Sequence, residues 1–480
     1  MNRLQLNLLF FFSIFPVFII RTHLSINDLF LIILIFFVFL FLNKLVLILI
    51  AKDFNNIFFQ TYLAVLISLG IDLNLGLHYG FVSPIRNYFQ TDDFIHLYYL
   101  ASFVLVIVFL INFFIVKMLK LKGFKILFSF LVIIFIFNIF DNTKNSKNIL
   151  NFDNAYQLNK KVENTKLIII TDEMAGVNSL ESKTKEGMKF DKLVKKFSEK
   201  FNFNLYTNIY SKYPSSISSI SSILNKNFEQ TKMDLYFKKD QNYFSDYKFI
   251  KNETFDKFQS ISVYQNMHIN YCEHLNVIKC NQYNPFKTNK FTDGFKNTFL
   301  SRMFSIYNLQ GSIFFHVISR VFRELNLIDL LISPMGNKAS FENLLQILKK
   351  DIKSKKFDLI FVHTMTPHKP YGFDENCKYD GRKSIGNYNI INYDETTYRH
   401  NIDRICTVNF LKNFIQELDN ENYLKKLEIF FFSDHGARIV KENPESFLKS
   451  ILMSKQYNSE YREIKEKKIT SEVFHNLILD

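Results

Sequence analysis

The sequence has no tryptophan, no arginine-rich stripe and no motif typical of nucleic-acid-binding proteins. Its formal net charge is +14, but the lysines and arginines are scattered among acidic residues. Because nucleic-acid recognition needs a concentrated basic surface or a known module, we expect no nucleic-acid partner. Attraction to anionic lipid head groups explains the positive charge at least as well.

Charged residues are scarce before residue 141, where long apolar runs follow one another. A helix needs about 20 apolar residues to cross a bilayer. We therefore predict about five transmembrane helices, at residues 4–20, 29–50, 57–77, 98–116 and 124–140. The first run lacks a small-residue cleavage site, which favours a retained helix over a removed signal peptide. The expected division is a transmembrane domain over 1–141, a linker over 142–164 and a water-soluble domain over 165–480.

The loops between these helices predict their orientation. The short connection between the last two helices is rich in lysine (Lys117, Lys120, Lys122 and Lys125). Because cytoplasmic loops carry the excess of lysine and arginine, this connection is expected inside and the water-soluble domain outside. We expect Asp72 to be an interfacial residue, since the spans offer no second carboxylate or histidine for an ion relay.

A phenylalanine-rich run over 427–432 reads as a buried strand, and it ends in Ser433-Asp434-His435-Gly436. Open α/β sheets bind their ligands at the carboxyl ends of the strands. A carboxylate and an imidazole suit a divalent metal ion. The alternative is an ordinary capped turn, because a short motif is only a hypothesis.

A second apolar run, over 166–170, is of the kind that buried parallel strands show, and it ends in Asp172 and Glu173. Two acids at the end of a buried strand are unfavourable unless a positive group meets them. A metal ion would supply that charge.

The segment after Pro214 has isoleucines at helical spacing, so a helix is expected to begin near Ser215 and Ser216. A hydroxyl at that point lies at the positive end of the helix dipole, which favours an alkoxide or a bound phosphate. A plain serine N-cap is the structural alternative.

A third apolar run, over 357–363, leads into a loop in which His368 has prolines close on both sides. Proline removes backbone freedom, so the imidazole of His368 is expected in a fixed position. His363 lies on the predicted strand, and we interpret it as a packed core residue.

Helices predicted over 188–201 and 398–418, with a further strand over 202–210, complete an alternation of strands and helices. This alternation predicts an α/β fold with a parallel sheet and covering helices. At or directly after the ends of three predicted strands lie side chains that can bind metal or phosphate.

The order of these features resembles the membrane-anchored sulfatase-like proteins of the alkaline phosphatase superfamily. The features are the membrane helices, the acidic pair, the hydroxyl segment, a Pro-His-x-Pro-Tyr loop and the final Ser-Asp-His-Gly. The phosphoethanolamine transferases of lipopolysaccharide and the lipoteichoic acid synthases are the most similar branches. The resemblance implies an alkaline phosphatase/sulfatase-like sheet with covering helices, preceded by the transmembrane bundle.

The resemblance also implies a metal ion, zinc or manganese. Its implied ligands are a carboxylate at Asp172 or Glu173, the nucleophile itself, Asp434 and His435.

The nucleophile of the family is normally a threonine ahead of a Ser-x-Pro helix start. Ser216 takes that place here, with Ser215 as the alternative, and Ser221 replaces the usual proline. His368 matches the histidine that contacts the transferred phosphate group.

The implied reaction moves phosphoethanolamine or phosphoglycerol from a phospholipid donor to a lipid or glycan acceptor through a phosphoserine. The implied location is the bacterial cell membrane, with the catalytic domain on the extracytoplasmic side. The Cys/Ser-x-Pro-x-Arg pattern of classical sulfatases is absent near Ser215, so transfer ranks above sulfate hydrolysis. A sulfuric or phosphoric ester hydrolase of the same fold and an inactive membrane scaffold are the alternatives.

All four cysteines lie in the water-soluble domain. Disulfides persist in oxidising compartments outside the cytoplasm. Of the three possible connectivities, we choose Cys272–Cys280 and Cys377–Cys406.

Overall fold

The computed structural model describes most of the chain and divides it into two compact units. The described residues are 3–14, 53–77, 94–144, 150–157, 161–240, 245–266, 268–282, 312–324, 341–368, 371–378, 393–439 and 444–479, with scattered positions of 33–48. We call the first unit the apolar unit; it comprises residues 1–146, 295–332 and 387–390. The second, the α/β unit, comprises residues 147–294, 333–386 and 391–480.

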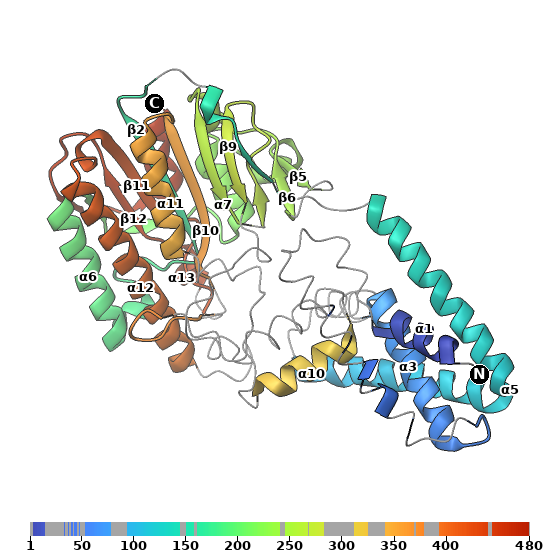
Figure 1. Ribbon diagram of the computed structural model, residues 1–480. Helices are drawn as coiled ribbons and strands as arrows, with labels where there is room; N and C mark the ends of the chain where they lie inside the picture. The colour runs from blue at the N-terminus through green and yellow to red at the C-terminus, as the bar shows by residue number, and fades with distance from the viewer. Residues whose placement is uncertain are drawn as a thin grey trace. The chain divides into compact units, whose positions relative to one another are not determined.

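The apolar unit is built from helices α1 (Arg3–Ile14), α3 (Ile57–Leu75), α5 (Phe94–Lys144) and α10 (Ile313–Glu324) (Figure 1). Helix α5 breaks its helical geometry at Lys120, so it contains both of the helices predicted over 98–116 and 124–140. Two described segments are long and apolar enough to cross a membrane, Ile57–Leu75 and Tyr99–Phe137. The helix predicted over 29–50 lies outside the described residues except at isolated positions, so the number five stays a prediction.

The polar residues inside α3 have partners within the apolar unit. The side-chain amide of Asn74 donates to the Phe12 carbonyl at 2.9 Å. Asp72, which is fully buried, accepts hydrogen bonds from the Ser312 hydroxyl at 2.6 Å and from the Phe314 backbone N–H at 3.0 Å. A buried carboxylate needs such donors. The expectation of an interfacial Asp72 is therefore wrong: the carboxylate is an internal cap for the start of α10.

A nine-stranded mixed sheet forms the centre of the α/β unit, in the order β1-β9-β7-β10-β2-β11-β12-β3-β13. Its strands are β1 (Asn151–Asp153), β2 (Thr165–Asp172), β3 (Asn204–Tyr206), β7 (Ile261–Gln265), β9 (Val277–Gln282), β10 (Leu359–Pro367), β11 (Leu427–Ser433), β12 (Leu452–Lys455) and β13 (Arg462–Ile464). Strands β9, β7, β10, β2 and β11 run parallel. The predicted parallel sheet is confirmed only for this centre, because β1 and β12 pair antiparallel with their neighbours.

Helices cover both faces of this sheet. On one face lie α6 (Lys185–Phe201), α11 (Phe341–Ser354) and α12 (Tyr393–Asn420) (Figure 1), and their apolar side chains share a core with those of the strands. The second core holds side chains of α7 (Ser216–Leu224), α8 (Glu253–Asp256) and α14 (Thr470–Phe474). Alternate residues of a strand point to opposite faces. The central strands are therefore apolar on both sides, which explains their near-continuous apolar runs.

Two segments differ from the expected organisation, and strands near the carboxyl terminus add to the sheet. The predicted strand over 202–210 is two short strands, β3 and β4 (Ile209–Tyr210), which belong to different sheets. The expected linker over 142–164 contains β1, which pairs with β9 at one end of the large sheet. Near the carboxyl terminus, β12 and β13 extend the other end of the same sheet.

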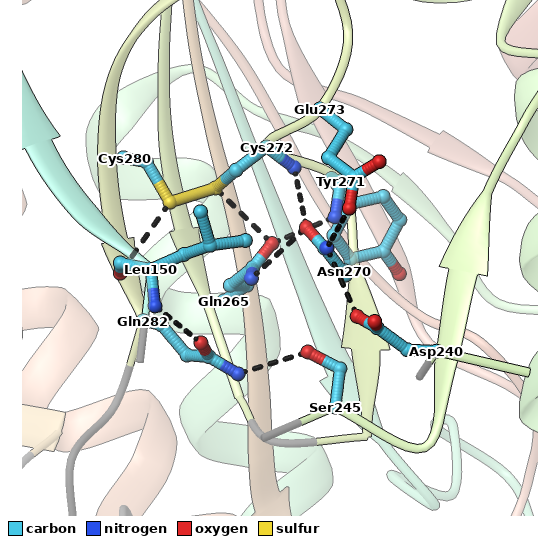
Figure 2. Close-up of a disulfide and its surroundings, with 10 residues drawn as sticks. All are labelled: Leu150, Asp240, Ser245, Gln265, Asn270, Tyr271, Cys272, Glu273, Cys280 and Gln282. Atoms are coloured by element: carbon cyan, nitrogen blue, oxygen red, sulfur yellow. Dashed lines mark hydrogen bonds between the residues drawn. A yellow bond between two sulfur atoms is a disulfide. The ribbon is translucent and has the colours of Figure 1, made fainter. Parts of the chain in front are cut away.

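Both predicted disulfides are confirmed, Cys272–Cys280 and Cys377–Cys406. Figure 2 shows the first, which joins the segment after β8 (Ile269–Asn270) to β9. Side-chain amides hold the backbone around it, since Gln265 Oε1 accepts from the Tyr271 N–H at 2.7 Å. Asn270 Oδ1 accepts from the Cys272 N–H at 2.9 Å. The disulfide and these amides fix the position of Tyr271, whose ring lies in the second core.

Candidate metal and nucleophile site

The carboxyl ends of β2 and β11 bring two acidic residues together. The two strands are parallel neighbours, with Ser433 opposite Thr171 in the register. The Asp434 N–H donates to the Thr171 carbonyl at 3.0 Å, which continues the pairing beyond the last strand residue. Asp172 and Asp434 therefore leave adjacent strands at the same edge of the sheet, where open α/β sheets bind ligands.

Hydrogen bonds orient the Asp434 carboxylate. Its Oδ1 accepts from the backbone N–H groups of His435 at 2.7 Å and Glu173 at 3.2 Å. Its Oδ2 is buried and has no hydrogen-bond partner among the described residues. A buried carboxylate oxygen without a donor is unfavourable. Asp434 is fully buried, so its Oδ2 is in a position to bind a group that is not one of the described residues.

The imidazole of His435 faces the same point. Its Nδ1–H donates to the Gly436 carbonyl at 2.8 Å, which leaves Nε2 as the ring nitrogen that faces the carboxylates. Nε2 lies 3.6 Å from Asp434 Oδ2 and 3.9 Å from Asp172 Oδ1. We call Asp172, Asp434 and His435 the ligand cluster; one ligand atom from each lies within 4.8 Å of the others, and all three side chains are buried.

This donor set fits a divalent metal ion. Two carboxylates and one neutral imidazole are ligands that zinc and manganese accept. The Nδ1–H bond to a backbone carbonyl is the outer contact that metal-ligating histidines usually make.

The residue after His435 must be glycine-sized, because a Cβ at Gly436 would collide with the carbonyl oxygens of Ser446 and Lys449.

Helix α7 places a hydroxyl beside the cluster. Ser216 is the first residue of the helix, and its Oγ lies 3.4 Å from His435 Nε2. Ser219, on the next turn, donates its hydroxyl hydrogen to the backbone carbonyl of Asp434, which fastens the helix start to the loop after β11. Ser215 is the N-cap residue and is exposed, whereas Ser216 is buried. The structure therefore brings Ser216, and not Ser215, to the ligand cluster.

Glu173 points away from the other predicted metal ligands. Its backbone adopts a positive φ of 57°, which is unusual for a residue with a side chain. Its carbonyl accepts from His400 Nε2 at 3.0 Å. Its buried carboxylate accepts a hydrogen bond from Arg438 Nε and lies 3.5 Å from His368 Nε2. Glu173 therefore lies next to the ligand cluster, but its carboxylate pairs with the side chains of Arg438 and His368.

Arg438 has no counterpart among the residues predicted from the sequence. Its terminal Nη2 lies 3.5 Å from His368 Nε2, and 39% of its side chain is exposed. Burial acts to lower the pKa of Arg438, but the charges of Glu173 and the two cluster acids raise it overall. A signal existed in the sequence, since Arg438 follows the Asp434-His435 pair by only a few residues.

A second polar layer lies in the core of the α/β unit and includes His363. The Tyr271 hydroxyl, on the ring labelled in Figure 2, donates to His363 Nδ1 at 3.0 Å. Burial lowers the pKa of His363 to about 4, although the charge of Asp434 opposes this shift. Burial and the charges of Asp434 and Asp172 raise the pKa of Tyr271. Both groups are therefore neutral near pH 7, and the expectation that His363 is a packed core residue is confirmed.

Comparisons with known proteins give similarity in structure only. Neither models of protein families nor curated protein sequences match the chain. The C-terminal periplasmic domain of the phosphoethanolamine transferase EptC from Campylobacter jejuni is similar, with 10% identity, a TM-score of 0.40, and coverage of 66% of this chain and 88% of that one. The lipoteichoic acid synthase LtaP from Listeria monocytogenes has 9% identity, a TM-score of 0.37, and coverage of 66% and 72%.

A protein in the alkaline phosphatase superfamily from Vibrio parahaemolyticus is also similar, with 10% identity and a TM-score of 0.37. The similarity covers 68% of each chain. The Vibrio protein is described as a member of the superfamily that the sequence motifs resemble. At this degree of similarity the solved structures do not assign a reaction to the chain.

Proposed function

We propose that this chain is a membrane-anchored, metal-dependent enzyme that transfers a phosphoethanolamine or phosphoglycerol group from a phospholipid to an envelope lipid or glycan. The observation that carries the proposal is the position of Ser216, whose Oγ lies 3.4 Å from His435 Nε2 in the ligand cluster. A hydroxyl at a helix start beside metal-competent side chains is the arrangement of an activated nucleophile.

In this proposal Asp172, Asp434 and His435 would hold zinc or manganese, and the Ser216 hydroxyl would be a further ligand. A bound divalent ion lowers the pKa of a hydroxyl and offsets negative charge on a phosphoryl group. Glu173, a ligand candidate from the sequence, pairs with Arg438 instead.

The reaction then has two displacements. The Ser216 Oγ attacks the phosphorus of the donor, its proton passes to water, and the bond from phosphorus to the diacylglycerol oxygen breaks. His368 gives a proton to that departing oxygen. An acceptor hydroxyl next attacks the phosphorus of the phosphoserine and loses its proton to solvent. The bond from phosphorus to the Ser216 Oγ breaks, and Oγ takes up a proton from solvent. With water in place of the acceptor, the same steps give the alternative reaction, hydrolysis.

The proposed division of labour follows the two units. The transmembrane domain over 1–141 anchors the chain in the bacterial cell membrane, and the catalytic domain lies on the extracytoplasmic side. The two disulfides support an extracytoplasmic location of the catalytic domain, because such bonds persist in oxidising compartments.

The test is the site of covalent modification. Full-length protein in detergent, loaded with zinc or manganese, is incubated with vesicles of phosphatidylethanolamine and phosphatidylglycerol and analysed by mass spectrometry after proteolysis. We expect a phosphoethanolamine or phosphoglycerol adduct on Ser216 that Ser216→Ala removes and Ser215→Ala retains. An adduct on Ser215 would contradict the nucleophile assignment. Release of soluble head group with no adduct on any serine would favour hydrolysis, and no metal-dependent reaction would support an inactive scaffold.

A further inference from the structure

Arg438 lies between the buried acids and solvent. Its Nε donates to Glu173, whose side chain is only 1% exposed, while the side chain of Arg438 is 39% exposed. The guanidinium therefore has one edge bound to a buried carboxylate and the remaining edge toward His368 and solvent. A terminal nitrogen, Nη2, lies 3.5 Å from His368 Nε2.

Glu173 fixes this arginine in place. A buried carboxylate is stable only with a charged or hydrogen-bonding partner, and the pairing uses the Nε–H of Arg438. The terminal N–H groups of a guanidinium form a planar fork that matches the oxygens of a phosphate. Because the long side chain is already held, binding an anion would lose less conformational entropy than it would with a free surface arginine.

The charges around the site favour an anion at this fork. The two cluster acids and Glu173 are all buried, and a bare carboxylate environment repels a phosphate. Arg438 offers the exposed cationic surface next to these acids, and it feels the charges of Glu173 and both cluster acids. Arg438 is therefore a partly exposed cationic group next to the buried acids, where it can contact an anion.

We infer that Arg438, which lies beside His368, binds the anionic oxygens of the substrate phosphate, and that Glu173 is the positioning residue of Arg438 and not a metal ligand. The inference deepens the proposed function and rests on it for the identity of the anion as a phosphate ester. It adds a substrate contact that neither the metal cluster nor the nucleophile supplies.

The test uses inorganic phosphate as the probe and needs no turnover. Ser216→Ala protein, loaded with zinc or manganese, is titrated with phosphate by calorimetry. Loss of a charge-assisted contact is expected to weaken phosphate binding roughly 10- to 100-fold in Ser216→Ala/Arg438→Gln. Arg438→Lys should give an intermediate affinity, because it retains the charge without the fork. Arg462→Gln, on the exposed strand β13, is the matched control and should bind phosphate like its parent.

Glu173→Gln separates the positioning role from metal binding. It should retain the metal content of its parent and still bind phosphate several-fold more weakly, because Arg438 loses its charged partner. Unchanged phosphate affinity in Arg438→Gln would overturn the inference, as would loss of metal in Glu173→Gln. These outcomes do not depend on the adduct experiment, so a failure of the Ser216 chemistry and a failure of the anion site would be distinguishable.

Discussion

Asp72 and Asp434 are both fully buried carboxylates, one in the apolar unit and one in the α/β unit, and their surroundings differ. Both oxygens of Asp72 accept hydrogen bonds from the start of α10, including one from the Ile313 N–H at 2.9 Å. Asp434 has two donors on Oδ1 and none among the described residues on Oδ2. A buried acid with complete hydrogen bonding stabilises structure, whereas a buried acid with one oxygen left over is prepared for a ligand.

The largest expected effect comes from removing the negative charge of the incomplete acid. Asp434→Asn should lower the rate of phosphoryl transfer on the order of 10³-fold or more, because a metal ion contributes several kcal/mol of transition-state stabilisation. Asp72→Asn, the matched substitution in the other unit, should leave the rate per folded molecule within about twofold of the parent. The measurement is transfer or hydrolysis at saturating metal. Equal losses in the two variants would erase the proposed difference between the acids.

The two units should also respond differently to reduction. All four cysteines lie in the α/β unit. Loss of either disulfide is expected to lower the free energy of unfolding of that unit by about 2–4 kcal/mol. The effect should be greater for Cys377–Cys406, which spans 29 positions, than for Cys272–Cys280, which spans 8. Thermal unfolding of the paired serine variants measures this order. The same loss of stability in both would contradict the dependence on loop length.

Asp72→Asn should lower the stability of the apolar unit and have little effect on the reaction rate. The substitution replaces the carboxylate that accepts hydrogen bonds from Ser312, Ile313 and Phe314 with a neutral amide. The free energy of unfolding of the apolar unit should therefore fall by about 1–3 kcal/mol. Proteolysis within residues 312–324 in detergent measures how firmly α10 is held. Ser312→Ala, which removes only one of the donors, should give a smaller increase in cleavage. Unchanged cleavage in Asp72→Asn would show that the cap does not hold α10.

The smallest expected effect is a dependence of stability on pH that comes from His363 in the α/β unit. The folded-state pKa of His363 is about 4, below the ordinary value of 6.5. The unfolded chain therefore takes up a proton first, so this stability is fully present above about pH 6.5 and falls toward pH 4. At pH 5.5 the loss relative to pH 7 should be about 1 kcal/mol smaller in His363→Gln than in the parent. Equal losses in denaturant titrations would show that His363 does not contribute.

The sequence predicted the parts of this fold that depend on local pattern. The apolar runs of β2, β10 and β11 are visible in the sequence as strands. The polar residues at or directly after their ends, Asp172, His368 and Asp434, are visible as well. The edges of the sheet were missed, because β1, β12 and β13 are short and depend on pairing with segments far away in the chain. The same holds for α10, whose place in the apolar unit depends on contacts with α3 and α5.

The site was predictable to the extent that its residues end strands or begin helices. Asp172, Asp434, His435 and Ser216 occupy such positions, and the structure brings them together. Which of two neighbouring acids faces the cluster depends on the positive φ at Glu173, and no residue pattern indicates that conformation. Arg438 follows Asp434 and His435 closely in the sequence, but its pairing with Glu173 at the end of β2 depends on the folded sheet, which brings the two side chains together.

The most direct test of this account is the metal content of the purified protein. Full-length parent, Asp434→Asn and Asp72→Asn are prepared in the same detergent, dialysed against zinc and manganese, freed of unbound ions and analysed by mass spectrometry of the elements. We expect about one equivalent in the parent and in Asp72→Asn, and a large loss in Asp434→Asn. A parent that binds no metal, or an Asp434→Asn variant that retains it fully, would contradict the assignment of the ligand cluster.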